Sequence, residues 1–138
     1  MESGPDLATQ SWTSAVEFLQ EVERASPDVM PRMAIHASCY SMFHAARAVI
    51  NQVDGLAAPT RHGSVVGRFG QLAKQANDAE MMAAGRLLNE VQAERLLSDY
   101  RAGRRPPASD AVAAVADARS FLEACARCRG FSMPGVAG

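Results

Sequence analysis

Four polar or ionisable side chains fall on one side of a single helix-forming stretch. They are His36, Tyr40, His44 and Arg47, and their spacing of four, four and three residues places them on one face of an α-helix. An imidazole can exchange a proton near neutral pH, and a guanidinium can donate paired hydrogen bonds to a phosphate. The alternative is structural: the same groups would be core residues whose polar ends bond to a neighbouring helix.

A second group of side chains that could take part in binding or catalysis extends an apolar stripe further along the chain. The helical spacing of apolar residues in 81–91 continues into Arg95 and Asp99, with Tyr100 alongside. Charges that extend a core stripe lie at the rim of a bundle or inside it, where an unpaired charge is costly. At a rim, Arg95 would adjoin a basic loop that suits a phosphate backbone, although a solvated loop is the alternative. The arginines of this loop are Arg101, Arg104 and Arg105.

The cysteines do not form a recognisable metal site. Cys125 and Cys128 make a single CxxC pair, and Cys39 stands far from both with no pair of histidines near it. A structural zinc site needs four ligands, so we expect no metal and no cofactor. The chain also has no phosphate-binding glycine loop, no GxSxG and no HExxH motif, which excludes the enzymes that depend on them.

Composition predicts a single helical domain. The 138 residues are 48% hydrophobic, 21% charged and 6% aromatic, with a net charge of −1, so no overall basic field indicates nucleic acid. We expect one domain over 1–138, with a core at about 10–128 and flexible ends. The apolar runs are too short to span a membrane, no secretory signal is evident, and three cysteines suit a reducing compartment. A cytoplasmic location is therefore expected.

Helical periodicity predicts an all-α, up-and-down bundle of four or five helices. The second helix is apolar or small nearly all round, which is typical of a central helix. In the last helix we expect Val112, Val115, Ala118, Leu122 and Cys125 to face inward, and the tail after Gly130 to be loose. We expect the first helix to begin at Ser14 or Ser11, and the second to span 31–53 after an Asp28 cap. The third and fourth helices should span 62–75 and 79–100. The fifth should begin with a Ser109 or Asp110 cap and end at Gly130.

Three sequence segments, in order, resemble motifs of bacterial HEPN-domain proteins. CYSMFHAARAVI (39–50) resembles the family's S-R-A-Y-Y-A-M-F-H-A-A-R-A helix, RHGSVVGRFG (61–70) resembles T-H-x-G-V-x-x-x-F, and ERLLSDY (94–100) resembles R-x-x-x-D-Y. The resemblance covers about residues 12–126 and implies a HEPN-like bundle that often dimerises. Cys39 stands where the family has the first Tyr of its Tyr-Tyr pair.

The resemblance implies two kinds of function. Many HEPN proteins are metal-independent ribonucleases that act as toxins and are restrained by a partner encoded nearby, typically a minimal nucleotidyltransferase. This chain would then be the RNA-acting, toxin-like component of such a two-gene system and would form a homodimer. The alternative is a non-catalytic helical module that dimerises and binds a nucleotide, a nucleotidyltransferase or another partner.

The chain departs from the family at the catalytic signature. The usual signature is an Arg followed four to six residues later by a His on the same helix, but no His follows Arg95. A substitute arrangement would use His44 or His62 as the general base on a ribose 2′-hydroxyl, with Arg95 and Arg47 stabilising the charge on the phosphorane. Arg101, Arg104 and Arg105 would bind RNA, and Tyr40, Asp99 and Tyr100 would brace the site.

Overall fold

Five segments with helical periodicity form helices in the computed structural model. The structure describes residues 4–25, 29–55, 57–100 and 106–134, and their side chains except those of 4–6 and 93–100. The described residues contain helices and no strand, which confirms the all-α prediction. The helices are α1 (Gly4–Arg24), α2 (Pro31–Asp54), α3 (His62–Ala76), α4 (Ala79–Tyr100) and α5 (Ala108–Arg129).

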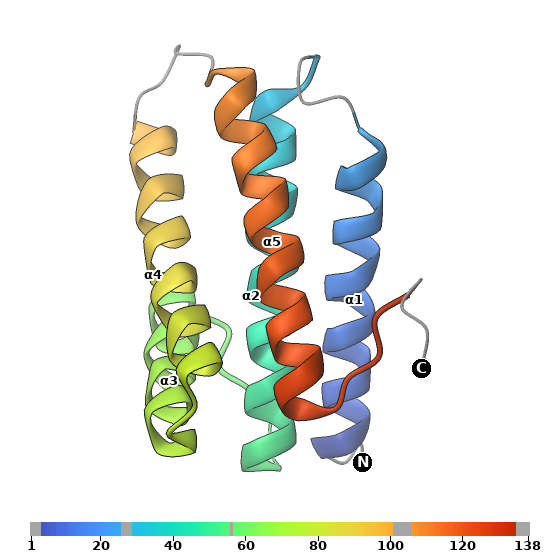
Figure 1. Cartoon of the computed structure of the whole chain (residues 1–138), viewed down its shortest axis with the longest axis vertical. Coiled ribbons are helices and arrows are strands. Elements are labelled where there is room, and N and C mark those ends of the chain that lie inside the picture. The colour runs from blue at the N-terminus through green and yellow to red at the C-terminus, as the bar shows by residue number, and fades with distance from the viewer. Residues whose placement is uncertain (1–3, 26–28, 56, 101–105, 135–138) are drawn as a thin grey trace.

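The central position of α2 is confirmed. This helix contacts each of the other four, while α1, α2, α4 and α5 run lengthwise and the shorter α3 lies beside the first part of α4 (Figure 1). Small buried residues on several sides of α2, among them Ala34, Ser41, Ala45 and Ala48, let its neighbours approach closely. Because Ser41 also donates a hydrogen bond to the Ala15 carbonyl at 2.7 Å, α1 and α2 are joined by a polar contact inside the core.

Helix ends follow the residues that favour them. Gly55 and Gly130 adopt the left-handed conformation that ends α2 and α5, and Asn77 does so at the end of α3. The carboxylate of Asp78 then accepts hydrogen bonds from the backbone N–H groups of Glu80 (2.9 Å) and Met81 (3.1 Å), which caps α4. These contacts explain why the break at 77–78 was predictable.

The predicted start of the first helix is wrong. The helix begins at Gly4, so neither Ser14 nor Ser11 is its cap. The buried stripe extends towards the N-terminus through Trp12 and Ala8, and the Ser11 hydroxyl accepts a hydrogen bond from Asn51 Nδ2 at 3.2 Å. Ser11 is therefore a polar residue of the core that joins α1 to α2.

Three other local predictions also fail. The residue that caps α5 is Pro107, which places Ser109 and Asp110 in the first turn. Val112 is 56% exposed, because the inward stripe of α5 passes through its neighbour Ala111 instead. The N-cap position of α2 is Met30, not Asp28, which lies outside the described residues.

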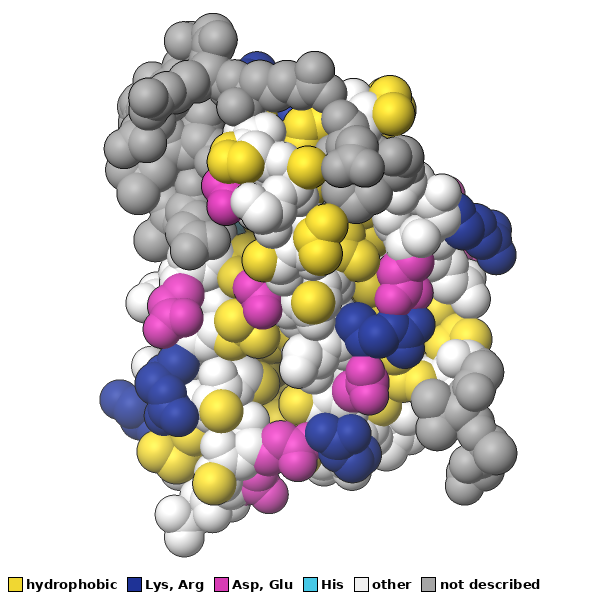
Figure 2. All heavy atoms as spheres, turned by 45° about the horizontal axis from the view of Figure 1, so that its top comes forward, with side chains coloured by type: hydrophobic (Ala, Val, Ile, Leu, Met, Phe, Trp, Pro, Cys, Tyr) yellow, Lys and Arg dark blue, Asp and Glu magenta, His cyan; other side chains and the backbone are white. Residues whose placement is uncertain are grey.

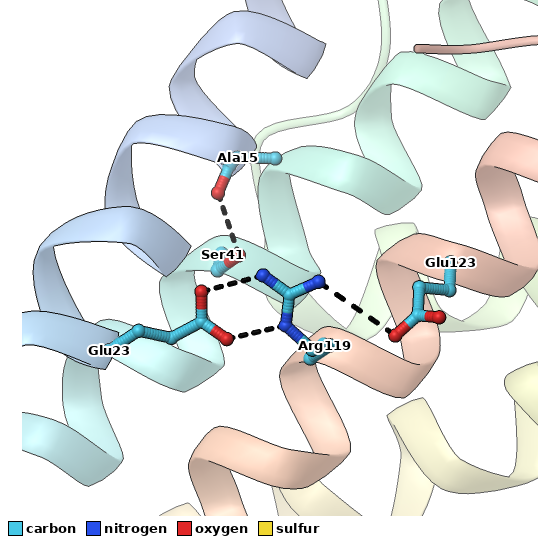
Figure 3. Close-up of polar contacts among 5 residues, drawn as sticks. All are labelled: Ala15, Glu23, Ser41, Arg119 and Glu123. Atoms are coloured by element: carbon cyan, nitrogen blue, oxygen red, sulfur yellow. Dashed lines mark hydrogen bonds and ion pairs between the residues drawn. The ribbon is translucent and has the colours of Figure 1, made fainter. Parts of the chain in front are cut away.

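Contacts across the bundle join its first and last helices. Arg119 of α5 forms a two-pronged ion pair with Glu23 of α1, with Nη2 at 2.7 Å from one carboxylate oxygen, and also lies 3.9 Å from Glu123 (Figure 3). The segment after α5 turns back towards α1 (Figure 1), and Phe131 stacks on Trp12 with ring centroids 4.5 Å apart. This part of the expected loose tail is packed, so the packed chain extends beyond residue 128.

The described surface is mixed in charge. On the face shown in Figure 2, acidic and basic side chains lie next to one another, and no field of a single sign covers it. None of the helices in the described ranges combines the length and apolarity that crossing a bilayer requires.

Candidate functional site

Five aromatic or imidazole rings gather along one side of α2, where this helix meets α1 and the start of α3. They are Phe18 of α1, Tyr40, Phe43 and His44 of α2, and His62, the first residue of α3. We call these five residues the ring cluster. It brings His62 together with Tyr40 and His44, which the sequence placed on one face of a different helix.

His62 lies against α2 through a ring contact. Its imidazole stacks on Phe43 with centroids 4.3 Å apart and an interplanar angle of 29°, and it meets the edge of Tyr40 at 6.3 Å. Arg61, which precedes it, has extended backbone dihedrals and occupies the N-cap position of α3. The imidazole is half-buried, so its position is defined by packing while part of it remains accessible.

His44 contacts the rings of Phe18 and Phe43 within the ring cluster. Its imidazole is nearly parallel to Phe18 at 5.6 Å and meets the edge of Phe43 at 5.7 Å. Burial lowers the pKa of His44 below its ordinary value of 6.5, and the nearby charge of Arg47 lowers it further. The neutral imidazole is therefore favoured at pH 7, and a neutral imidazole can accept a proton.

Arg47 already has partners within the fold. Its Nε donates a hydrogen bond to the carbonyl of Pro59 at 3.2 Å, and its Cζ lies 6.0 Å from the centroid of the Phe43 ring. The guanidinium therefore joins α2 to the loop that precedes α3. If Arg47 also stabilises the charge of a phosphorane, as predicted, it does so while its Nε holds the loop.

Tyr40 is on the outer side of the ring cluster. Its ring lies 5.8 Å from Phe18, and the residue is 36% exposed. His44 is half-buried. Neither residue is thus enclosed in the core, which leaves both able to meet a bound molecule.

A small pocket connects the ring cluster with α4. Arg95 follows one turn after Val91 on α4, which places its backbone near this pocket although its side chain lies outside the description. The residues that line the pocket are Cys39, Met42, Phe43, His62, Leu88, Val91 and Gln92.

The remaining predicted site residues cannot be placed as side chains. Asp99 and Tyr100 belong to the last turn of α4, and their side chains, like that of Arg95, lie outside the description. The basic loop is also outside the described residues; its members are Arg101, Arg104 and Arg105.

His36 lies apart from the ring cluster, at the start of α2. It lines a shallow surface pocket with Val29, Met30 and Met33, which are all exposed apolar residues. The predicted face of α2 is therefore divided: His36 lies in a shallow apolar pocket, while Tyr40 and His44 belong to the ring cluster.

Sequence reasoning overlooked Phe18, Phe43 and Asn51. Phe43 stands three residues after Tyr40 and four before Arg47, so its spacing could have identified it. Phe18 is on another helix, and no spacing within one helix indicates it. Asn51 is fully buried and bonds both α1 and the loop after α2, a role that becomes visible only in three dimensions.

The three cysteines are divided between two helices, α2 and α5. Cys39 is on α2, and Cys125 is buried in α5, where desolvation raises the pKa of its thiol. Cys128 is half-buried, with its sulfur 4.0 Å from an oxygen of Asp78. Within the described ranges, no group of three or more His, Cys, Asp or Glu residues is arranged to hold a metal ion.

Comparison with known proteins identifies the family. No curated protein and no solved structure matches the chain. The family model of the HEPN domain matches residues 8–128, which include the ring cluster, the segment 94–100 and nearly all of the five helices. The match covers most of the chain and agrees with the helical bundle. The chain belongs to the HEPN-domain family.

Proposed function

We propose that this HEPN-domain protein cleaves RNA without a metal ion and is the toxin-like component of a two-gene system. The observation that carries the proposal is that two imidazoles, His44 and His62, both contact the ring of Phe43. They come from two helices, and one of them has a lowered pKa. A pair of imidazoles in different surroundings can divide the work of a base and an acid.

The reaction assigns each group a role. Neutral His44 accepts the proton of a ribose 2′-hydroxyl, and the 2′-oxygen attacks phosphorus. Protonated His62 donates a proton to the departing 5′-oxygen, which leaves a 2′,3′-cyclic phosphate and a 5′-hydroxyl. The positive charges of Arg47 and Arg95 stabilise the phosphorane, Arg101, Arg104 and Arg105 bind the RNA backbone, and Tyr40, Asp99 and Tyr100 brace the site.

Partners follow from the same proposal. The protein would act as a homodimer and be restrained by a nucleotidyltransferase-type partner in the cytoplasm. The second candidate, a non-catalytic module that dimerises and binds a nucleotide or a partner, is favoured by one observation: no His follows Arg95 within the family's usual spacing.

Expression without a partner and cleavage of purified RNA in EDTA test the proposal. We expect wild-type protein to slow growth and to leave cyclic phosphate ends, and we expect His44→Asn, His62→Asn and Arg95→Ala each to reduce cleavage by about a hundredfold or more. Arg86→Ala, an exposed arginine on the same helix as Arg95, is the matched control and should retain cleavage. A wild-type protein that neither slows growth nor cleaves RNA would leave the binding module as the function.

A further inference from the structure

We infer that Asn51 is a positioning residue that places His62 in the ring cluster by holding the loop between α2 and α3. This inference rests on the proposed function for its importance in catalysis, but its structural content is independent of it. Asn51 is 2% exposed, and it lies on α2 one turn after Arg47.

The amide of Asn51 bonds in two directions. Its Oδ1 accepts a hydrogen bond from the backbone N–H of Ala58 at 2.6 Å, and its Nδ2 donates to Ser11 Oγ on α1 at 3.2 Å. Ala58 is itself buried, at 6% exposed, so its N–H takes its partner from a side chain in place of water. The loop is thus fixed to a helix that is in turn fixed to α1.

Successive turns of α2 hold successive points of the chain that leads to His62. Asn51 holds Ala58, Arg47 holds the carbonyl of Pro59, and Phe43 stacks on His62. The three α2 residues are spaced by four, so they form a row along one side of the helix. The loop therefore lies along α2, and the place where α3 begins is set by this row.

Loss of the Asn51 oxygen would release the loop at its buried end. A buried N–H without a partner is unfavourable, so the Ala58 backbone would move towards water to regain one. His62 follows Ala58 by four residues and begins α3, so its stacking on Phe43 would loosen. A group that must deliver a proton loses efficiency when its orientation is not fixed.

Asn51→Leu tests the inference, because leucine fills a similar volume but offers no hydrogen bond. The readout is the NMR spectrum of the His62 ring protons, which stacking on Phe43 displaces upfield in the wild-type protein. We expect the variant to lose this displacement, so that the signals move towards their positions in the urea-unfolded protein. In a cleavage assay, the variant should lower kcat much more than it changes KM.

Ser11→Ala is the matched control. It removes the other hydrogen bond of the same amide and leaves the bond to Ala58 in place, so the His62 ring signals should stay near their wild-type positions. Wild-type positions in Asn51→Leu would overturn the inference. A wild-type protein that does not cleave RNA would overturn the proposed function alone, because the ring signals do not depend on activity.

Hydrogen exchange of the wild-type protein gives a second test that needs no variant to fold. The Ala58 amide lies outside any helix, yet its bond to Asn51 should slow its exchange at least tenfold relative to an unstructured peptide. Exchange at the unstructured rate would show that Asn51 does not hold the loop.

Discussion

The fold shifts the pKa of His44, one of the candidate site residues. Folding places it among rings and beside Arg47, so the folded protein binds its proton less tightly than the unfolded chain does. The unfolded chain therefore takes up more protons as the pH falls through about 6.5, and the contribution of His44 to stability is lost there. We expect wild-type protein to lose stability relative to His44→Gln between pH 7.5 and pH 5.5, measured by urea unfolding at each pH.

An NMR titration of the same imidazole separates the two causes. Arg47→Gln should raise the pKa of His44 only part of the way to 6.5, because burial is the larger cause and remains in the variant. A wild-type His44 that titrates at or above 6.5 would contradict its burial among the rings.

At this scale, residue spacing predicted part of the site. The spacing of Tyr40, His44 and Arg47 correctly placed them along one helix, and two of them join the ring cluster. The approach of His62 depends on the loop held by Asn51, and residue types alone do not reveal how a loop turns. The sequence also could not show that Arg47 bonds to Pro59, since that partner belongs to the loop.

Among the elements, α3 is the helix with the weakest local sequence. It contains Gly67 and Gly70, and a Cβ added at either would meet nothing within 4 Å. Alanine at each position should therefore stabilise the protein by about 0.5–1 kcal/mol, because it reduces the backbone entropy of the unfolded chain without a clash. Thermal unfolding followed by circular dichroism measures the effect.

Gly55→Ala is the control for these substitutions. Gly55 has a φ of +69°, where a side chain is strained, so alanine should destabilise the protein even though the space is open. A lower melting temperature for Gly67→Ala or Gly70→Ala would mean that the helix needs these glycines for a reason other than its own stability.

Helix boundaries were predictable where local chemistry determines them. The predicted bounds of α4 agree with the structure, where the carboxylate of Asp78, a residue type that favours helix starts, caps the helix. The start of α1 was not predictable. Ser11 is a residue type that often caps helices, but here its hydroxyl accepts a hydrogen bond from Asn51 of α2. Val112 was misplaced since an alanine-rich helix offers two adjacent apolar stripes, and only packing selects the one through Ala111.

At the scale of the whole molecule, α2 organises the bundle. It contacts every other helix and carries three of the five rings of the ring cluster. Its lack of charge between Met33 and Arg47, visible in the sequence, follows from this position. The helix α3 and the loop before it both contact α2, which is also where the candidate site lies.

The segment that follows α5 meets α1 at Trp12, the only tryptophan in the sequence. Its indole N–H donates to the Ser132 carbonyl at 2.9 Å, and its ring stacks on Phe131, so the C-terminal segment covers α1. Phe131→Ala should cost about 1–2 kcal/mol, because the half-buried ring loses stacking and burial, and should shift Trp12 fluorescence to longer wavelength as water reaches the indole. Val112→Ala, which removes an exposed apolar side chain of α5, should leave the emission unchanged. An unchanged emission maximum in Phe131→Ala would mean that the end of the chain does not shield the first helix.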